Sequence, residues 1–253
     1  MVDGNTITIV TGGASGIGLA TARALLAADP VAHVAVVDVD NCDVHEVDKM
    51  AHGHLHHHHC DVTDAAQVAN CARRIAQAHE VIGLVNSAGI VLAAIPSEEL
   101  SLQDLRRMFS VHVEGALLWC QAAKRLWQRD RRGGAIVNVG SVAARFGWPG
   151  RLAYGAAKVA IESMTRTLAV EWADSGVRVN AVCPGYVDTP LQDDQRRPPG
   201  LPTLEDAARR HAVGRVAGAE EIASGIAFLL SEQASFITGE VLMIDGGFSV
   251  MKT

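Results

Sequence analysis

Short apolar runs alternate along this chain with longer amphipathic stretches, and most of the runs end at a glycine or a small polar residue. The apolar runs predict strands at 6–10, 34–37, 81–85, 134–141, 177–182 and 241–244, with a further strand inside 52–62. The amphipathic stretches predict helices at 19–28, 64–79, 101–129, 154–172 and 220–230. Strands that alternate with helices indicate an α/β protein: a Rossmann-like, doubly wound parallel sheet with helices on both faces. In such folds ligands bind at the carboxyl ends of the strands.

The whole chain, residues 1–253, is expected to form one domain, because a length of 253 residues suits a single large core and no linker or internal repeat interrupts it. The region 188–214 differs from the rest. It contains Pro198, Pro199 and Pro202, several charges and little apolar periodicity. We expect it to form a lid over the substrate.

Composition excludes several classes of protein. Hydrophobic residues make up 49% and charged residues 20%, and the net charge of −6 gives no reason to bind nucleic acid or an anionic membrane. The sequence has neither a long uncharged apolar stretch nor a signal peptide, so a cytoplasmic location is expected. The five cysteines form no CxxC pair and are expected to be reduced, mostly buried thiols.

Histidines crowd the segment that should contain the third strand, at positions 52, 54 and 56 to 59. Alternate histidines share one face of a strand and can bind a divalent metal. No carboxylate or thiol at suitable spacing completes a tetrahedral site in this segment. We therefore expect a half-exposed sheet edge there and predict no metal site.

A tyrosine and a lysine stand four residues apart in one predicted helix, at Tyr154 and Lys158, and so lie on one helix face. A nearby cation favours phenolate and lowers the pKa of a tyrosine, which makes a general acid or base. Ser141 ends the preceding strand and brings a hydroxyl to the same edge of the sheet. These three residues are the predicted catalytic group.

A glycine-rich turn joins the first strand to the first helix and contains Gly12, Ser15, Gly16, Ile17 and Gly18. This arrangement places backbone N–H groups and a helix N-terminus against a pyrophosphate. The second strand ends at Asp38, whose carboxylate can accept hydrogen bonds from both ribose hydroxyls and would repel a 2′-phosphate. The pattern favours NAD over NADP.

In this order, the motifs TGxxxGxG, NxAG, YxxxK and PG resemble those of the short-chain dehydrogenase/reductase family, over nearly the whole chain. The resemblance implies hydride transfer between the C4 atom of a nicotinamide and a carbonyl or secondary alcohol carbon. It implies that Tyr154 exchanges the proton with the substrate oxygen, Ser141 hydrogen-bonds that oxygen, and Lys158 binds the nicotinamide ribose. It also implies a homotetramer or homodimer. The further cofactor contacts that it implies are Asp61, Val62, Asn86, Ala88, Gly89, Pro184, Gly185, Val187 and Thr189.

Two positions depart from the family pattern. Ser87 stands where the family usually has asparagine, which is a mild change at a site dominated by the backbone. His112 stands where the family commonly has a fourth catalytic residue, also an asparagine. Imidazole can donate and accept a proton with a pKa near 6.5, so we expect His112 either to relay protons and titrate in the assay range or to be a packed neutral side chain.

The leading hypothesis is an NAD-dependent dehydrogenase of secondary alcohols or ketones that acts on an apolar, cyclic small molecule. Val91, Leu92, Val142, Phe146 and Trp148 are candidates for the pocket wall or for the core. The close alternative is a 3-oxoacyl-thioester reductase; those that use NADPH usually carry an arginine at the position of Ser15. A cofactor-binding regulatory protein without turnover is the third possibility.

Overall fold

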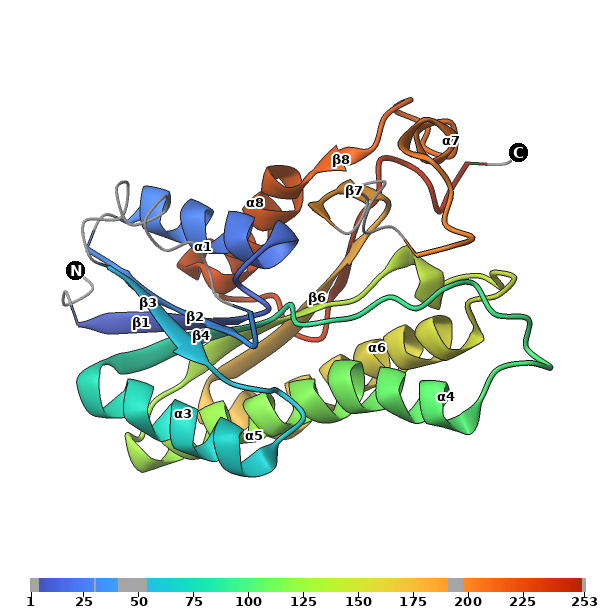
Figure 1. Ribbon diagram of the computed structural model, residues 1–253. Coiled ribbons are helices and arrows are strands. Elements are labelled where there is room, and N and C mark those ends of the chain that lie inside the picture. The colour runs from blue at the N-terminus through green and yellow to red at the C-terminus, as the bar shows by residue number, and fades with distance from the viewer. Residues whose placement is uncertain (1–4, 30, 41–53, 191–197, 252–253) are drawn as a thin grey trace.

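One parallel sheet with helices on both faces forms the body of the protein (Figure 1). The structure, a computed structural model, describes residues 5–29, 31–40, 54–190 and 198–251. Within this part, seven strands pair in the order β3-β2-β1-β4-β5-β6-β9, all parallel. They are β1 (Thr6–Thr11), β2 (His33–Asp38), β3 (Leu55–His59), β4 (Glu80–Asn86), β5 (Gly134–Val139), β6 (Val177–Pro184) and β9 (Val241–Ile244).

Two layers of helices cover the sheet, and Figure 1 shows them above and below it. The helices α1 (Gly16–Ala28) and α8 (Ala219–Leu230) lie on one face, and α3 (Ala65–Ala78), α5 (Gly115–Arg129) and α6 (Leu152–Trp172) lie on the other. Successive strand residues point to opposite faces, so Ile9 packs into one core and Val10 into the other. Burial on both faces explains why the strands are continuous apolar runs.

The predicted long helix at 101–129 has three parts. It consists of α4 (Leu102–Phe109), a stretch of wider π-helical turns at Ser110–Glu114, and α5. Such turns occur mostly as local bulges and often lie at functional sites. Within the bulge, His112 is the buried residue.

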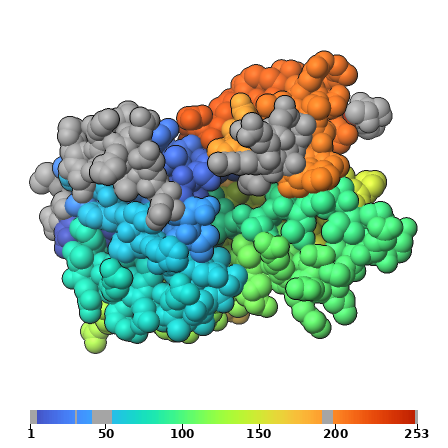
Figure 2. Space-filling model, viewed as in Figure 1, coloured from blue at the N-terminus to red at the C-terminus, as the bar shows by residue number. Residues whose placement is uncertain are grey.

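The region expected to be a lid holds some regular structure. Its described part contains α7 (Leu204–Ala208), and next to it the short strands β7 (Val187–Asp188) and β8 (Ala217–Gly218) pair in parallel. Residues 191–197 lie outside the described part. The N–H of Ala94 donates to the carbonyl of Pro199 at 2.9 Å, so the segment after the gap touches the loop that follows β4. In Figure 2 the orange segment that carries α7 lies above the green segment of α4 on this face of the molecule.

Several element boundaries differ from the prediction. The strand expected to end at Ser141 ends at Val139, and Ser141 caps the short helix Val142–Ala144 that follows. The first helix starts at Gly16, inside the glycine turn, and the third strand ends at His59 rather than at Asp61 and Val62. In the described residues no helix is both long and apolar enough to cross a membrane. Because the chain leaves β1 toward β2 on one side and returns to β4 on the other, a crevice opens at the carboxyl ends of β1 and β4.

Candidate active site

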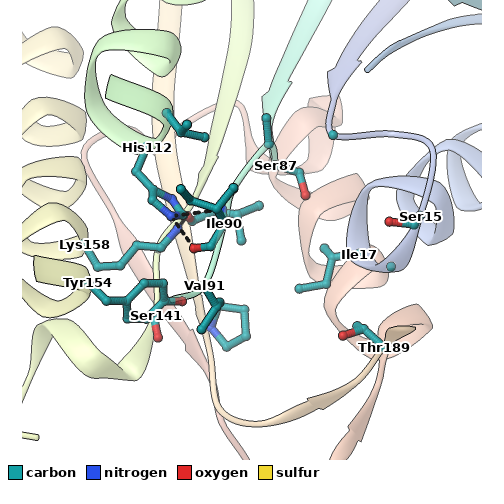
Figure 3. A pocket seen from close by; sticks show the side chains of 18 of the residues that line it. Ser15, Ile17, Ser87, Ile90, Val91, His112, Ser141, Tyr154, Lys158 and Thr189 are labelled. Carbon is teal, nitrogen blue, oxygen red and sulfur yellow. Dashed lines mark hydrogen bonds between the residues drawn. The ribbon is translucent and has the colours of Figure 1, made fainter. Parts of the chain in front are cut away.

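A cavity of about 930 Å³ lies at the carboxyl edge of the sheet and gathers most of the residues that the sequence singles out. A volume of this order suits a small-molecule ligand site. The predicted site residues that line it are Gly12, Ser15, Gly16, Ile17, Asp38, Asp61, Val62, Ala88, Gly89, His112, Ser141, Tyr154, Lys158, Pro184, Gly185, Val187 and Thr189. Figure 3 shows the glycine turn and the Tyr154 group on opposite sides of this space.

The glycine turn is shaped by close backbone approach. Gly12 has φ +63°, and a Cβ atom there would lie 2.6 Å from the Cα of Ala88, so only glycine fits. Gly16, with φ +52°, opens α1 at the cavity. The Asp38 carboxylate accepts the Ala14 N–H at 3.0 Å and the Asp40 N–H at 3.2 Å, which fixes it beside the turn. Each carboxylate oxygen keeps acceptor capacity for a ribose. This cradle fits a dinucleotide.

Gly18 and Asn86 lie outside the cavity lining. A Cβ at Gly18 would lie 2.2 Å from the Gly12 carbonyl oxygen, so this glycine lets α1 pack against the turn. The Asn86 side chain donates to Asn138 Oδ1 at 2.8 Å, and Asn138 donates to Thr165 Oγ1 at 2.9 Å. This buried chain of amides joins β4, β5 and α6 and holds together the strands that carry the site.

Ser141, Tyr154 and Lys158 meet at one end of the cavity (Figure 3). A hydrogen bond with Ser141 favours the phenolate of Tyr154, but burial is the larger effect and raises the pKa of Tyr154. The Lys158 Nζ atom donates to the Val139 carbonyl at 2.8 Å and lies 5.6 Å from the Tyr154 ring centroid. Burial lowers the pKa of Lys158 to about 8.

The expected net lowering of the pKa of Tyr154 is not found in this structure. Burial raises the pKa of Tyr154, and the cation that opposes this rise is Arg151. The physical reason is that the Lys158 ammonium is directed to the β5 carbonyl, while the phenol loses hydration in the cavity wall. Tyr154 is therefore a protonated phenol at neutral pH and is ready to donate.

His112 is buried against the loop after β4. Its Nε2 atom lies 2.8 Å from the Ile90 carbonyl oxygen and 3.2 Å from the Ile90 nitrogen, and its ring packs edge-on to Tyr154 at 5.6 Å (Figure 3). A Cβ at Gly89 would lie 2.6 Å from the His112 ring. Burial, together with the charge of Lys158, lowers the pKa of His112 to about 3. Of the two alternatives for His112, this low pKa favours the packed, neutral side chain.

The sequence prediction misses two buried residues that bring polar groups to the cavity, Arg151 and Tyr186. An arginine three residues before a tyrosine and a tyrosine after a Pro-Gly pair have no spacing that indicates a site. Of the candidate pocket residues, Val91, Leu92, Val142 and Trp148 line the cavity, whereas Phe146 lies outside it and contacts Phe248.

A glycine turn at a strand-to-helix junction, with a serine, tyrosine and lysine across the same cavity, defines a dehydrogenase that uses a nicotinamide dinucleotide. Comparison with known proteins agrees. Residues 12–249 match the family described as Enoyl-(Acyl carrier protein) reductase. A cis-4-hydroxycyclohexanecarboxylate dehydrogenase of Sinomonas cyclohexanicum is 40% identical over 250 residues, and the match covers 97% of each chain.

Solved structures give the same result. A short-chain dehydrogenase/reductase mutant of Serratia marcescens matches with a TM-score of 0.86 and 32% identity, over 97% of this chain and 98% of that one. ElxO with NADP bound matches with a TM-score of 0.87 and 30% identity, over 98% and 99%. The chain belongs to the short-chain dehydrogenase/reductase family and is an oxidoreductase of that type.

Proposed function

We propose that this protein is an NAD-dependent dehydrogenase that interconverts a cyclic secondary alcohol and its ketone. The observation that carries the proposal is the meeting of Ser141, Tyr154 and Lys158 at one cavity with the Asp38 carboxylate at its far end. When bound, the nicotinamide accepts or supplies a hydride at its C4 atom.

The side chains supply the proton chemistry. The Tyr154 hydroxyl lies on the cavity wall, where it donates a proton to a ketone oxygen during reduction and accepts one from an alcohol during oxidation. The Ser141 hydroxyl supplies a second hydrogen bond to the same oxygen. Lys158 is a cation below a pH of about 8 and stabilises negative charge that develops on the phenol and the substrate oxygen.

Asp38 supports NAD as the cofactor, because its carboxylate lines the cavity and a 2′-phosphate would meet a negative charge there. Replacing Asp38 with asparagine keeps a hydrogen-bonding side chain and removes the charge, while alanine removes both. We expect the ratio of kcat/KM with NAD to kcat/KM with NADP to fall about 10- to 100-fold in Asp38→Ala. Most of the increase in kcat/KM with NADP should already be present in Asp38→Asn, because that variant has lost the charge. An unchanged ratio in both variants would show that Asp38 only stabilises the glycine turn and does not select the cofactor.

A cyclic substrate is supported by the apolar side chains on the cavity wall, Leu92, Val142 and Trp148 among them. It is also supported by the relative from Sinomonas cyclohexanicum, whose name describes a dehydrogenase of a hydroxylated cyclohexane ring. A flat apolar wall accepts a ring without leaving polar groups unpaired.

A 3-oxoacyl-thioester reductase is the second candidate, because the matching family is described as an acyl-carrier-protein reductase. The uncharged Ser15 and the acidic Asp38 oppose the NADPH that such enzymes use. Purified protein should be assayed for NADH formation with cyclic and linear secondary alcohols, and for oxidation of NADH and NADPH with a 3-oxoacyl thioester. Highest kcat/KM for cyclic alcohols with NAD supports the proposal. Preference for the thioester with NADPH would replace it with the second candidate, and cofactor binding without turnover would indicate a regulatory protein.

A further inference from the structure

Arg151 is a buried cation at the wall of the cavity, directly before α6. Arg151 is only 7% exposed. Its Nη1 atom donates to the Leu92 carbonyl at 2.6 Å. Its Nη2 atom is buried with no hydrogen-bond partner among the described residues, and no carboxylate of those residues forms an ion pair with it. A buried guanidinium without an anion is unfavourable, and this one borders a cavity that can admit one.

Tyr186 follows β6 and lines the same cavity. It is also 7% exposed, and its hydroxyl has no hydrogen-bond partner in the described part of the chain. The ring packs edge-on to Trp148 at 5.6 Å, and its backbone N–H donates to His211 Nε2 at 3.1 Å, so it is fixed in place. Burial raises the pKa of Tyr186 to about 12, which keeps the hydroxyl a donor at neutral pH.

We propose that Arg151 and Tyr186 form an anion subsite that binds a carboxylate on the substrate, which makes the substrate a cyclic hydroxy acid or oxo acid. This proposal rests on the proposed function. A guanidinium and a phenol that face one cavity are both donors, and a carboxylate is the acceptor that satisfies both. Leu92 and Trp148 lie beside them and contact the ring, and Tyr154 reaches the reacting oxygen.

The test compares a hydroxycyclohexanecarboxylate with its methyl ester and with cyclohexanol, using NAD. The parent enzyme should prefer the carboxylate over the ester. In Arg151→Gln the carboxylate-to-ester ratio of kcat/KM should fall about 10- to 100-fold, and in Tyr186→Phe by a smaller factor, as expected when hydrogen bonds to a charged group are lost. Arg125→Gln is the matched control, since Arg125 is an exposed cation on α5 outside the cavity lining, and its ratio should stay at the parent value.

Other outcomes would overturn the subsite. If Arg151→Gln lowers kcat/KM by the same factor for the carboxylate, the ester and cyclohexanol, the role of Arg151 is only to hold the loop that contains Leu92. If the parent oxidises all three equally, the dehydrogenase proposal stands and the subsite fails. If no alcohol is oxidised, the proposed function fails. In that case calorimetric titration with cyclohexanecarboxylate still tests the subsite. The subsite proposal requires that cyclohexanecarboxylate binds to the parent and binds more weakly to Tyr186→Phe. Circular dichroism verifies that each variant is folded.

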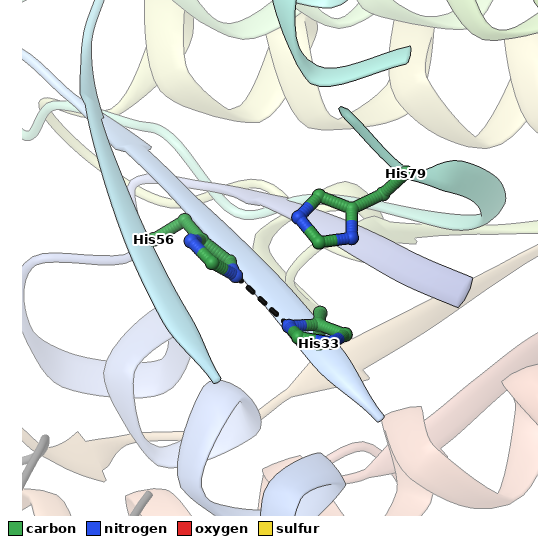
Figure 4. Close-up of side chains that lie close together, drawn as sticks. All are labelled: His33, His56 and His79. Atoms are coloured by element: carbon green, nitrogen blue, oxygen red, sulfur yellow. Dashed lines mark hydrogen bonds between the residues drawn. The ribbon is translucent and has the colours of Figure 1, made fainter. Parts of the chain in front are cut away.

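A second and independent feature is a cluster of histidines at the opposite end of β2, formed by His33, His56 and His79 (Figure 4). One ring nitrogen from each lies within 4.8 Å of the others, and His33 Nδ1 lies 2.9 Å from His56 Nε2. The three residues come from β2, from β3 and from the C-terminus of α3. The Nδ1 atom of His79 is buried.

We infer that this cluster binds one divalent transition-metal ion of the kind that prefers imidazole, such as Zn²⁺ or Ni²⁺. Three histidines leave a fourth position for water. Since β2 runs from His33 to Asp38 at the cavity, the metal joins two strands and a helix far from the chemistry and stabilises the fold.

Untagged protein should bind one Zn²⁺ per chain in equilibrium dialysis and show a higher Tm with Zn²⁺ than with Mg²⁺ or EDTA. His56→Gln and His79→Gln should abolish both effects. His59→Gln is the control, because His59 is exposed on the other face of β3, and it should retain them. A parent without metal-dependent stabilisation, or binding that survives in both His56→Gln and His79→Gln, would overturn the site.

Discussion

The buried His112, next to the tyrosine that we propose as catalytic, has a protonation state set by its surroundings. Because burial lowers the pKa of His112 to about 3, the ring is neutral throughout an ordinary assay. We expect the parent and His112→Asn to show the same pH dependence of kcat between pH 5 and 9, with rates within about tenfold. His112→Ala should be slower, because the Ile90 backbone loses its partner. A limb in the parent profile that His112→Asn removes would show that the ring titrates and relays protons.

The same shift predicts a dependence of stability on pH. The unfolded chain protonates His112 near pH 6.5, whereas the folded chain does so only near pH 3. A depressed folded pKa means that stability present above pH 6.5 is lost as the pH falls toward 3. The free energy of unfolding should therefore fall more steeply on acidification in the parent than in His112→Asn, as measured by urea unfolding. Parallel curves would contradict the low pKa.

Residue chemistry that follows a local pattern could be predicted from the sequence, and chemistry assembled across the fold could not. Tyr154 and Lys158 lie one helical turn apart, and the glycines of the first turn lie close together in the sequence, so their placement follows from local spacing. Arg151 and Tyr186 come from separate elements and have no spacing signal. The histidine cluster was missed for the same reason, because two of its members, His33 and His79, lie outside the run of histidines.

At the scale of elements, α8 begins with a charged cap that should matter for stability. The Glu221 carboxylate accepts the Gly218 N–H at 2.9 Å and pairs with Arg215, and these contacts lower the pKa of Glu221 to about 2. The stabilisation is present above pH 4.5, the value for an unfolded chain, and is lost as the pH falls toward 2. Glu221→Gln should lower Tm at pH 7, and the difference from the parent should shrink between pH 4.5 and 2.

Glu220→Gln is the control for this prediction. It removes a charge from the same first turn without removing the bond to Gly218, so its effect on Tm should be smaller. An equal loss in both variants would assign the effect to the charge at the helix N-terminus rather than to the cap.

The order and type of the main elements were predictable because strands buried on both faces are continuous apolar runs and helices have a distinct period. Element boundaries that depend on tertiary packing were less predictable. The bulge at Ser110–Glu114 leaves no signal in a periodic helix pattern, and α1 begins inside the glycine turn, where the Ser15 carbonyl accepts the Leu19 N–H.

At the scale of the whole molecule, one face of α6 presents an apolar stripe. Leu152, Val159 and Val170 are 53%, 48% and 81% exposed, and their spacings of seven and eleven residues place them on one side of the helix. We expect a second copy of the chain to cover this stripe, as the family resemblance implies. Light scattering after gel filtration should give a dimer or tetramer for the parent and smaller species for Val170→Glu.

Val213→Glu is the matched control, because Val213 is 60% exposed but lies outside the stripe, and it should keep the parent mass. A monomeric parent would contradict the expectation, and an oligomer that is unaffected by Val170→Glu would place the interface elsewhere.

The central claim is that Tyr154 exchanges the proton during hydride transfer at this cavity. The most direct measurement is the rate of NADH formation from a cyclic secondary alcohol by the parent and by Tyr154→Phe, with NAD affinity measured on both by calorimetry. The variant keeps the ring and loses only the hydroxyl. We predict a fall in kcat of about 10²- to 10⁴-fold with NAD affinity unchanged. A variant within about tenfold of the parent kcat, with NAD bound normally, would show that another group exchanges the proton.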